Sequence, residues 1–366
     1  MTHPERYVFF SKSMWSEPPR MRHQLARLIQ YFGGEVVFFQ KPAFFWENLR
    51  AWDDVSASDG VKLSRTKQLI HHQLRIFDFL GWVNAEFEER SIREKIGDYL
   101  DERVVVVNFN YDYFFLRKLF PKNKIVTIIN DDFVAQARVG VSHVEKTLSE
   151  TCKSSDVVLT VSYPLVRKLS RWCAPVLFLP WADAPYSPPD SSGKRDAVLI
   201  WASINNILDF ELLAELAKKS PDTEFFLVGP MSRRARRMVE NLISRNLNVF
   251  YFSARPLESL PLERFFAGFM PYKSGVASTE AVTLANKSLR LMSKGLPLIV
   301  HGMPHFFKHE AIFSCTNSEQ ILERFEQCKR DFLRLQKDIE ILVSENSPES
   351  RHGLFVNTLN AVERKM

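Results

Sequence analysis

Short apolar runs alternate with longer amphipathic stretches along the first half of the chain. The apolar runs are continuous and rich in β-branched and aromatic residues, and they lie at 6–10, 35–39, 103–109, 124–129 and 156–161. Strands that are buried on both faces, as in parallel sheets, have such runs. Apolar residues at helical spacing fill the intervals at 20–32, 62–80, 84–100, 111–120, 143–155 and 163–172. The pattern predicts an open α/β layer.

The second half repeats this alternation after a segment that is rich in proline and serine. Residues 180–195, PWADAPYSPPDSSGKR, have a composition that disfavours regular structure and predicts a linker. After it we expect strands at 197–203, 224–229, 248–253, 266–272 and 296–300, and helices at 209–219, 232–246, 258–265 and 286–294. The fold class is therefore α/β, with two Rossmann-like domains that face each other across a cleft where ligands bind.

This organisation predicts two domains of similar size. The first should comprise residues 1–183 and the second residues 184–346, with a C-terminal helix at about 347–366 that packs back on the first domain. The composition, 45% hydrophobic and 25% charged, is that of a globular protein. Neither an apolar run of about 20 residues nor a secretory signal occurs, so we expect a cytoplasmic protein.

Charge and motifs exclude several classes of function. A net charge of +6 favours an anionic partner, but acidic residues are interspersed among the basic ones nearly everywhere. Neither GxGxxG nor GxxxxGK[ST] occurs, which argues against a dinucleotide-dependent enzyme and a P-loop ATPase. GxSxG, HExxH and CxxC are also absent, so no hydrolase or metal site is indicated. Basic and aromatic residues interleave at 111–124 without an RNP or helix-turn-helix pattern, and we expect no nucleic-acid partner.

An ordered set of motifs in the second half resembles a known family. WASINNILDFELLAELAKKSPDTEFFLVGP is followed by ARPLESLPLERFFAGFMPY and then by NKSLRLMSKGLPLIV. This order is similar to the donor-binding domain of GT-B glycosyltransferases. The first half, with MWSEPPRMRHQLARLIQYFGGEVVFF, IINDDFVAQ and SSDVVLTVSYPLVRKL, resembles group 1 glycosyltransferases of bacterial polysaccharide assembly. The resemblance implies the GT-B fold and a nucleotide-sugar substrate, without a metal ion or other cofactor.

A candidate diphosphate site lies at the start of the last predicted helix of the second domain. Asn286, Lys287 and Arg290 fall on the first turn of the helix that ends at Gly295. Helix N-termini attract anions, and residues three apart lie on one face of a helix. Together with the motif order, this favours binding of a diphosphate, whereas the alternative is that both cations merely face solvent.

Other candidate donor contacts follow the predicted strands. Ser203, Asn205 and Asn206 lie in the turn after the first strand of the second domain, where they either bind the donor or only form the turn. Gly229 in the VGP sequence and Arg255 in the RPLESLP sequence are implied by the family resemblance.

The stereochemistry of transfer is also suggested by resemblance. Many retaining members of the family carry two glutamates eight positions apart, but here Glu280 is followed at that spacing by Ser288, and Arg290 occupies the usual position of the second glutamate. Tyr272 with Lys287 instead resembles the inverting glucuronosyltransferases of xanthan assembly, in which a tyrosine and a lysine hold UDP. The resemblance therefore implies an inverting enzyme.

Inversion requires a general base for the acceptor hydroxyl. Asp131 and Asp132 directly follow the predicted strand 124–129, which places them at the carboxyl edge of the first sheet. One of two adjacent carboxylates usually points inward and the other caps the next segment, and the sequence leaves open which is which. His143 and Glu145 are secondary candidates.

The sequence thus favours a glycosyltransferase that moves a sugar from a nucleotide-diphosphate sugar to a glycan or lipid-linked acceptor. A non-catalytic subunit of the same fold and a sugar-nucleotide epimerase remain alternatives. Residues 41–52, KPAFFWENLRAW, combine aromatic and cationic side chains in a segment that either binds the surface of an anionic membrane or packs into the core.

Overall fold

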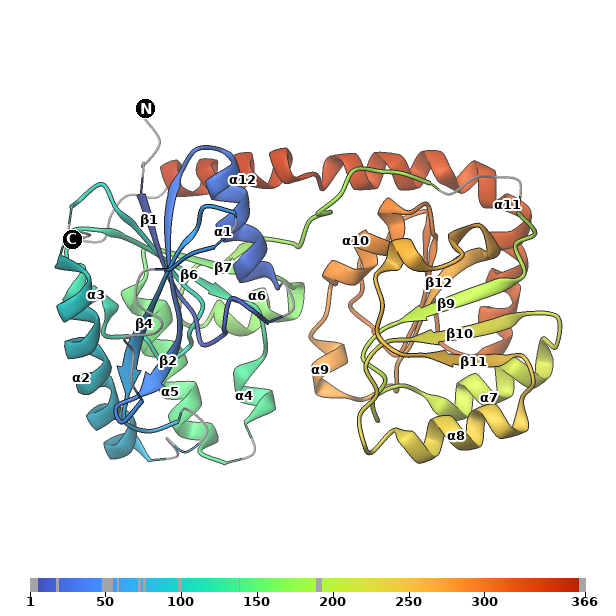
Figure 1. The fold of residues 1–366 in the computed structure, drawn as a ribbon, viewed down its shortest axis with the longest axis horizontal. Coiled ribbons are helices and arrows are strands. Elements are labelled where there is room, and N and C mark those ends of the chain that lie inside the picture. The colour runs from blue at the N-terminus through green and yellow to red at the C-terminus, as the bar shows by residue number, and fades with distance from the viewer. Residues whose placement is uncertain are drawn as a thin grey trace. The chain divides into compact units, whose positions relative to one another are not determined.

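The chain folds into two compact units. The computed structural model describes residues 6–17, 20–47, 55–57, 59–71, 74, 77–97, 101–137, 139–188 and 193–361. The first unit ends at Leu179 and resumes at Arg351, and the second runs from Pro180 to Ser350. Each unit contains one β-sheet flanked by helices (Figure 1). The class is therefore α/β with two parallel layers, as the pattern of apolar runs predicted.

The sheet of the first unit has the strand order β3-β4-β2-β1-β5-β6-β7-β8. Every neighbouring pair is parallel except β3 and β4. The strands are β1 (Arg6–Phe10), β2 (Glu35–Phe44), β3 (Val55–Ser56), β4 (Lys62–Gln68), β5 (Val105–Asn108), β6 (Lys124–Ile129), β7 (Val157–Thr160) and β8 (Val176–Leu177). The central strands are buried on both faces, which explains their continuous apolar sequences.

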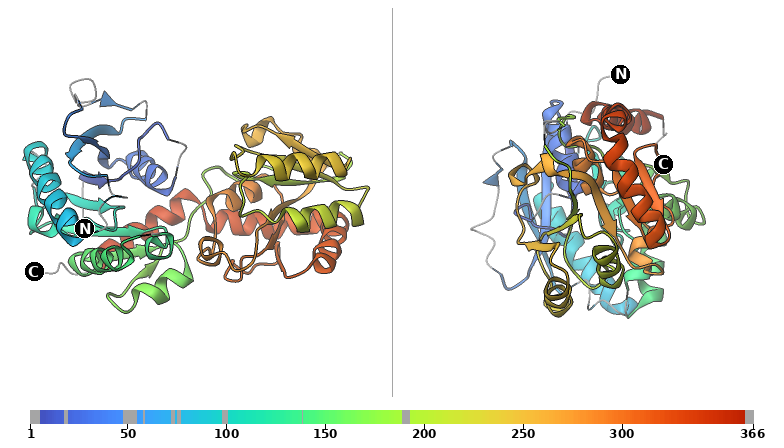
Figure 2. Two further views of the ribbon diagram at one scale, coloured as in Figure 1. Left: turned by 90° about the horizontal axis from the view of Figure 1, so that it is seen from below. Right: turned by 90° about the vertical axis from the view of Figure 1, so that its right-hand side faces the viewer.

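Helices pack on this sheet because successive side chains of each strand point to opposite faces. Val8 and Phe10 of β1 join a core cluster with Ile92 of α2. Tyr7 instead contacts Phe355 of α12, with ring centroids 6.4 Å apart. The helices are α1 (Met21–Tyr31), α2 (Asp78–Lys95), α3 (Leu116–Leu119), α4 (Phe133–Gln136), α5 (Val141–Ser154), α6 (Tyr163–Leu169) and α12 (Pro348–Ala361). Figures 1 and 2 show the C-terminal red ribbon of α12 against the first unit.

The helix expected over 62–80 is wrong. Its first part is the strand β4, which pairs in parallel with β2, and α2 begins only at Asp78. Polar side chains in β4 are buried because they have partners in the tertiary structure: Arg65 donates to the carbonyl of Lys41, and Gln68 donates to that of Pro42. In the sequence, these buried polar residues have the spacing of the polar face of an amphipathic helix, and the segment was predicted as a helix for this reason.

The sheet of the second unit is fully parallel, with the order β11-β10-β9-β12-β13-β14. Counted from its own first strand, this is the order 3-2-1-4-5-6 of Rossmann folds. The strands are β9 (Ala197–Trp201), β10 (Glu224–Val228), β11 (Val249–Phe252), β12 (Phe265–Pro271), β13 (Leu298–His301) and β14 (Ile312–Cys315). From β9, the strands β10 and β11 follow on one side, and β12, β13 and β14 follow on the other. The strand order therefore reverses between β9 and β12, which is the switch point of the sheet.

Helices cover both faces of the second sheet, and Figure 1 shows α7 and α8 along one of them. On α11, Phe325 packs against aromatic rings of β10 and β12. The helix expected at 258–265 is wrong: the segment forms two 3-10 turns, because Pro261 lacks an N–H and cannot continue a helix. The elements are α7 (Phe210–Lys219), α8 (Arg236–Arg245), η3 (Leu257–Ser259), η4 (Leu262–Arg264), α9 (Ala277–Glu280), α10 (Asn286–Ser293) and α11 (Ser318–Glu345).

Candidate functional site

The switch point of the second sheet is the expected position of a ligand site. Ligands of open α/β sheets bind beyond the carboxyl ends of the strands, where the strand order reverses. Ser203 follows β9 closely and Tyr272 directly follows β12, and these two strands are neighbours in the sheet. Every residue that we predicted for donor binding follows one of the strands β9 to β12 or lies on α10.

Tyr272 and Lys287 are in direct contact at this edge. The Lys287 ammonium group donates a hydrogen bond to the Tyr272 hydroxyl and lies 4.6 Å from the centre of its ring. Tyr272 is buried, and its carbonyl oxygen would lie 2.0 Å from a Cβ at Gly302, so a glycine is needed for this close approach. The tyrosine therefore holds the lysine at the carboxyl end of β12.

The start of α10 adds positive potential to this edge. Its N-cap residue, Ala285, makes no side-chain capping bond, and its first turn has no acidic residue. The first N–H groups of a helix carry partial positive charge and favour an anion. Lys287 lies in this turn, so a cation and a helix N-terminus act at the same place.

We predicted Arg290 on the first turn of the helix, but it lies in the last turn of α10, which begins at Asn286, and it contacts Trp201. Its guanidinium group is 5.2 Å from the centre of the Trp201 ring, and its Nε is 3.5 Å from a carboxylate oxygen of Asp183. The side chain is 38% exposed, so it is accessible while it rests on the indole. Aromatic faces attract cations, and this contact orients the arginine.

Trp201 connects two of the predicted arginines, although sequence analysis did not single it out. Its indole N–H donates to the carbonyl of Arg255 at 3.3 Å, while its ring supports Arg290. The exposed guanidinium of Arg255 lies 5.1 Å from the centre of the Phe252 ring. The signal in the sequence was a tryptophan that ends a strand directly before a polar turn. The structure thus brings Lys287 and Arg290 each onto an aromatic ring.

The turn after β9 has a clear structural role for one of its three candidates. The side-chain oxygen of Asn205 accepts a hydrogen bond from the N–H of Ile207 at 3.0 Å, so it stabilises the turn itself. Ser203 and Asn206 are exposed in the same turn. They are therefore available to a ligand, whereas the Asn205 side chain is engaged.

Gly229 has a reason to be glycine that does not involve a ligand. Its φ is +152°, and a Cβ at this position would lie 1.8 Å from the carbonyl oxygen of Ala202. The chain after β10 passes too close to the chain after β9 for any side chain. Its carbonyl accepts a hydrogen bond from the Tyr251 hydroxyl at 3.1 Å.

The two adjacent aspartates of the first unit have different environments. Asp132 is the N-cap of α4, where it accepts from the N–H of Ala135 at 3.0 Å, and it forms an ion pair with Lys168 at 2.6 Å. Among the described residues, the Asp131 side chain accepts one hydrogen bond, a long one of 3.4 Å from Gln136. Burial raises the pKa of Asp131, against smaller opposing effects of Gln136 and the nearby Arg22.

Arg22 lies at the same edge and was missed by sequence analysis. It is 8% exposed, and its Nε has no hydrogen-bond partner among the described residues. Burial lowers its pKa. Spacing could have revealed it, because Arg22, Leu25 and Ile29 share one face of α1, and the two apolar residues are buried. The edge thus holds a buried cation near the less engaged aspartate.

The secondary base candidates are engaged elsewhere. The Nδ1 of His143 lies 2.8 Å from a carboxylate oxygen of Asp78, and Glu145 forms an ion pair with Arg171 at 2.6 Å. Within the described residues, no group of three His, Cys, Asp or Glu side chains is arranged as metal ligands would be.

Part of the aromatic segment at 41–52 is on the surface. Phe45 is 51% exposed and Trp46 is 64% exposed, while Phe44 stacks on Trp46 with ring centroids 4.6 Å apart. Leu49, Arg50 and Trp52, which we expected in the same segment, lie outside the described residues. Among the described helices, none has the length and apolar character to span a bilayer.

Comparison with known proteins shows the fold. The chain matches no protein-family model and no curated protein sequence. It is similar in structure to HepE from Anabaena in complex with UDP, with a TM-score of 0.70 and 9% identity over 98% of this chain and 100% of that one. Sucrose-phosphate synthase from Thermosynechococcus elongatus gives 0.67 and 12% identity, with coverage of 96% and 95%.

A third similar structure is the UDP-forming α,α-trehalose-phosphate synthase from Burkholderia xenovorans in complex with glucose-6-phosphate. It gives a TM-score of 0.66 and 11% identity, with coverage of 97% of this chain and 100% of that one. These similarities extend over almost the whole of each chain. The chain therefore has the GT-B fold of glycosyltransferases, as its motif order implied.

Proposed function

We propose that this protein is an inverting glycosyltransferase that moves a sugar from a nucleotide-diphosphate sugar, a UDP-sugar, to a glycan or lipid-linked acceptor. The observation that carries the proposal is the cationic edge of the second sheet, where Lys287 and Arg290 rest on Tyr272 and Trp201 at the switch point. A similar structure, HepE, is a complex with UDP, which supports the same ligand here.

The diphosphate binds at the start of α10 in this proposal. Lys287 and N–H groups at the start of the helix contact its oxygens, and Arg290 supplies a second charge. Ser203, Asn206 and Arg255 are exposed after β9 and β11 and complete the donor site. When the bond to the sugar breaks, these groups stabilise the charge on the departing nucleoside diphosphate.

The acceptor is activated by Asp131. Its carboxylate removes the proton of an acceptor hydroxyl, whose oxygen attacks the anomeric carbon from the side opposite the diphosphate. A pKa raised by burial suits a base, since a more basic carboxylate takes up a proton more readily. Asp132 caps α4 and pairs with Lys168, so it positions this segment rather than reacting.

A nucleotide screen tests the proposal. UDP, GDP, CMP and TDP are compared by thermal shift, where a ligand at 100 times its Kd adds about 2.7 kcal/mol of apparent stability. We expect UDP to stand out and the shift to be much smaller in Lys287→Ala. Absence of a shift with all four nucleotides would contradict the proposal, and nucleotide binding without UDP release from any UDP-sugar would favour a non-catalytic subunit.

The acceptor side of the proposal includes the membrane. Phe45 and Trp46 are exposed near Lys41, a combination that inserts aromatic rings at a lipid interface while the cation meets anionic headgroups. The enzyme would then work at the inner face of the cell membrane on a lipid-linked acceptor. Binding of this kind weakens with salt.

Flotation with anionic vesicles at low salt tests this part. We expect the wild-type protein to float and the Phe45→Ser/Trp46→Ser variant to stay at the bottom. Tyr31→Ser is the matched control, since Tyr31 is 78% exposed but outside the segment. If all three proteins behave alike, Phe45 and Trp46 do not form a membrane-binding surface.

A further inference from the structure

Two adjoining hollows lie on the first unit, between α2, α5 and the chain that follows β5. Their volumes are about 380 and 430 Å³, within the range of about 300–1,000 Å³ for small-molecule sites. Trp82, Ala85 and Phe114 line both hollows. We call the two together the α2 groove.

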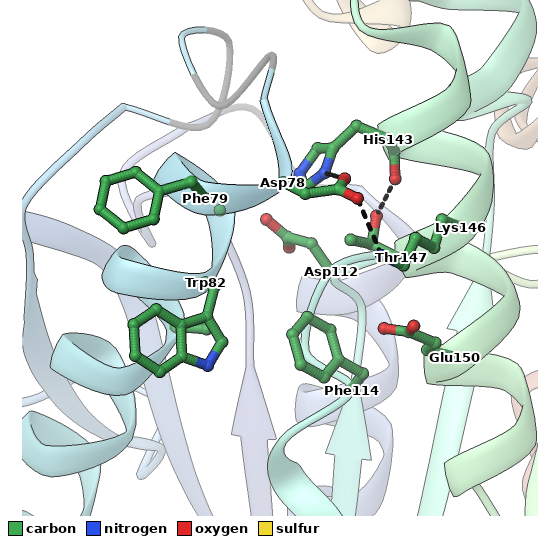
Figure 3. Close-up of a pocket in the computed structure, with 11 residues that line it drawn as sticks. Asp78, Phe79, Trp82, Asp112, Phe114, His143, Lys146, Thr147 and Glu150 are labelled. Carbon is green, nitrogen blue, oxygen red and sulfur yellow. Dashed lines mark hydrogen bonds and ion pairs between the residues drawn. The ribbon is translucent and has the colours of Figure 1, made fainter.

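The wall of the α2 groove carries exposed aromatic rings. Phe79 is 69% exposed and Trp82 is 57% exposed, although such large side chains are normally buried. They are three residues apart and so lie on the same side of the helix. Figure 3 shows both projecting from α2, with Phe114 between Trp82 and α5, while the Phe79 ring turns away from Asp112. The groove therefore offers apolar ring faces to solvent.

Carboxylates face the same space. Asp112 and Glu150 line the first hollow, and Glu150 has no hydrogen bond or ion pair with the described residues. Asp78 also lines it and is held by His143 and Lys146, each at 2.8 Å. Asp78 and Asp112 each have an ammonium partner, Lys146 and Lys12, so the carboxylate of Glu150 leaves a negative charge at the first hollow that disfavours an anionic ligand.

The α2 groove is held in shape by close packing where α2 meets α5. A Cβ at Gly81 would lie 2.4 Å from the His143 ring, which shows how tightly α2 meets α5. Asp112 forms an ion pair with Lys12, whose ammonium group lies 5.3 Å from the centre of the Tyr111 ring. A preformed site loses little conformational entropy when a ligand binds.

We propose that the α2 groove binds a neutral oligosaccharide. A pyranose ring has an apolar face of C–H groups, which stacks on an aromatic ring, and a rim of hydroxyl groups, which donate to carboxylates. Trp82 supplies the ring face, and Glu150 supplies acceptor oxygens. Two hollows that share Trp82 accommodate more than one sugar unit. The inference rests on the proposed function, because the α2 groove would be a second binding site for the glycan acceptor of that reaction.

Ligand-observed NMR on the full chain without nucleotide tests the inference. The probes are maltotriose, cellotriose, mannotriose and chitotriose at millimolar concentrations, with trigalacturonate as the anionic comparison. We expect at least one neutral trisaccharide to bind and trigalacturonate not to bind. In Trp82→Ala, affinity should fall about tenfold, which corresponds to 1.4 kcal/mol. Tyr31→Ala, at an exposed aromatic residue of α1 outside the groove, should bind as the wild type does.

Three outcomes would overturn the inference. They are the absence of binding by any neutral trisaccharide, equal binding by Trp82→Ala, and a dimer in solution that Trp82→Ala dissociates, which would assign the groove to a second copy of the chain. UDP titration of the same proteins separates this inference from the proposed function. Oligosaccharide binding without UDP binding would contradict only the transferase, and UDP binding without oligosaccharide binding would contradict only the groove.

Discussion

The carboxyl edges of the two sheets have opposite chemical characters. At the edge of the second sheet, Lys287 and Arg290 are half-buried cations in contact with aromatic rings, and Lys287 lies in the first turn of α10. At the edge of the first sheet, Asp131 is a half-buried carboxylate whose pKa is raised by burial, and Arg22 is a buried cation whose Nε has no hydrogen-bond partner among the described residues. In the proposed function, the same α/β architecture therefore provides an anion-binding edge in one unit and a proton-accepting edge in the other. Local side chains, and not the fold, make the difference.

The largest expected effect concerns the proton-accepting edge. Asp131→Asn removes the proposed base and should lower turnover by ~10²–10⁴, with UDP affinity unchanged. UDP release from a UDP-sugar in the presence of acceptor measures turnover, and calorimetry measures affinity. Asp132→Asn is the matched control and should retain most activity. Equal and mild losses in both variants would move the base to another residue.

The next effect concerns the anion-binding edge. Lys287→Ala and Arg290→Ala each remove a charge-assisted contact with phosphate, so each should weaken UDP binding by about 1.5–3 kcal/mol. Isothermal titration calorimetry measures this change. Lys218→Ala, at an exposed lysine of α7, is the control and should bind UDP normally. Unchanged UDP affinity in both site variants would show that the donor does not bind at this edge.

A smaller effect should separate the two aspartates by stability. Asp132→Asn keeps a capping side chain on α4 but loses the ion pair with Lys168, and we expect a loss of about 1 kcal/mol in the free energy of unfolding. Urea denaturation at pH 7 measures it. A loss of similar size in Asp131→Asn would mean that the two environments are not distinct in solution.

The smallest effect is a dependence on pH. Burial raises the pKa of Asp131 above its unfolded value, so the folded state binds its proton more tightly than the unfolded state does. The contribution of this group to stability is therefore greatest when it is protonated and falls as pH rises through the two pKa values. Asp131→Asn should be at least as stable as the wild type at pH 7. Parallel denaturation curves at pH 4 and pH 7 would show this, and a variant that is less stable at pH 7 would contradict it.

Much of the fold could be predicted because strands in a parallel sheet must be apolar over several consecutive residues. The runs predicted at 6–10 and 124–129 have the same bounds as β1 and β6. The strand β14 and the helix α11 were not predicted. In β14, Ile312 and Cys315 are buried but Ser314 is exposed, so the strand lacks a continuous apolar run. The strand β4 was mistaken for a helix because its buried polar residues are satisfied only by distant parts of the chain.

The candidate site divides in the same way. The sequence by itself determined which residues follow each strand and that Lys287 and Arg290 share a face of one helix, because these are local consequences of spacing. Only the tertiary structure decided that Trp201 lies under Arg290 and that Lys168 engages Asp132. These partners are far apart along the chain, so their contact depends on how helices pack against the sheets. For residues that are far apart in sequence, the separation along the chain does not give the separation in space. The environment of each charged group depends on its neighbours in space.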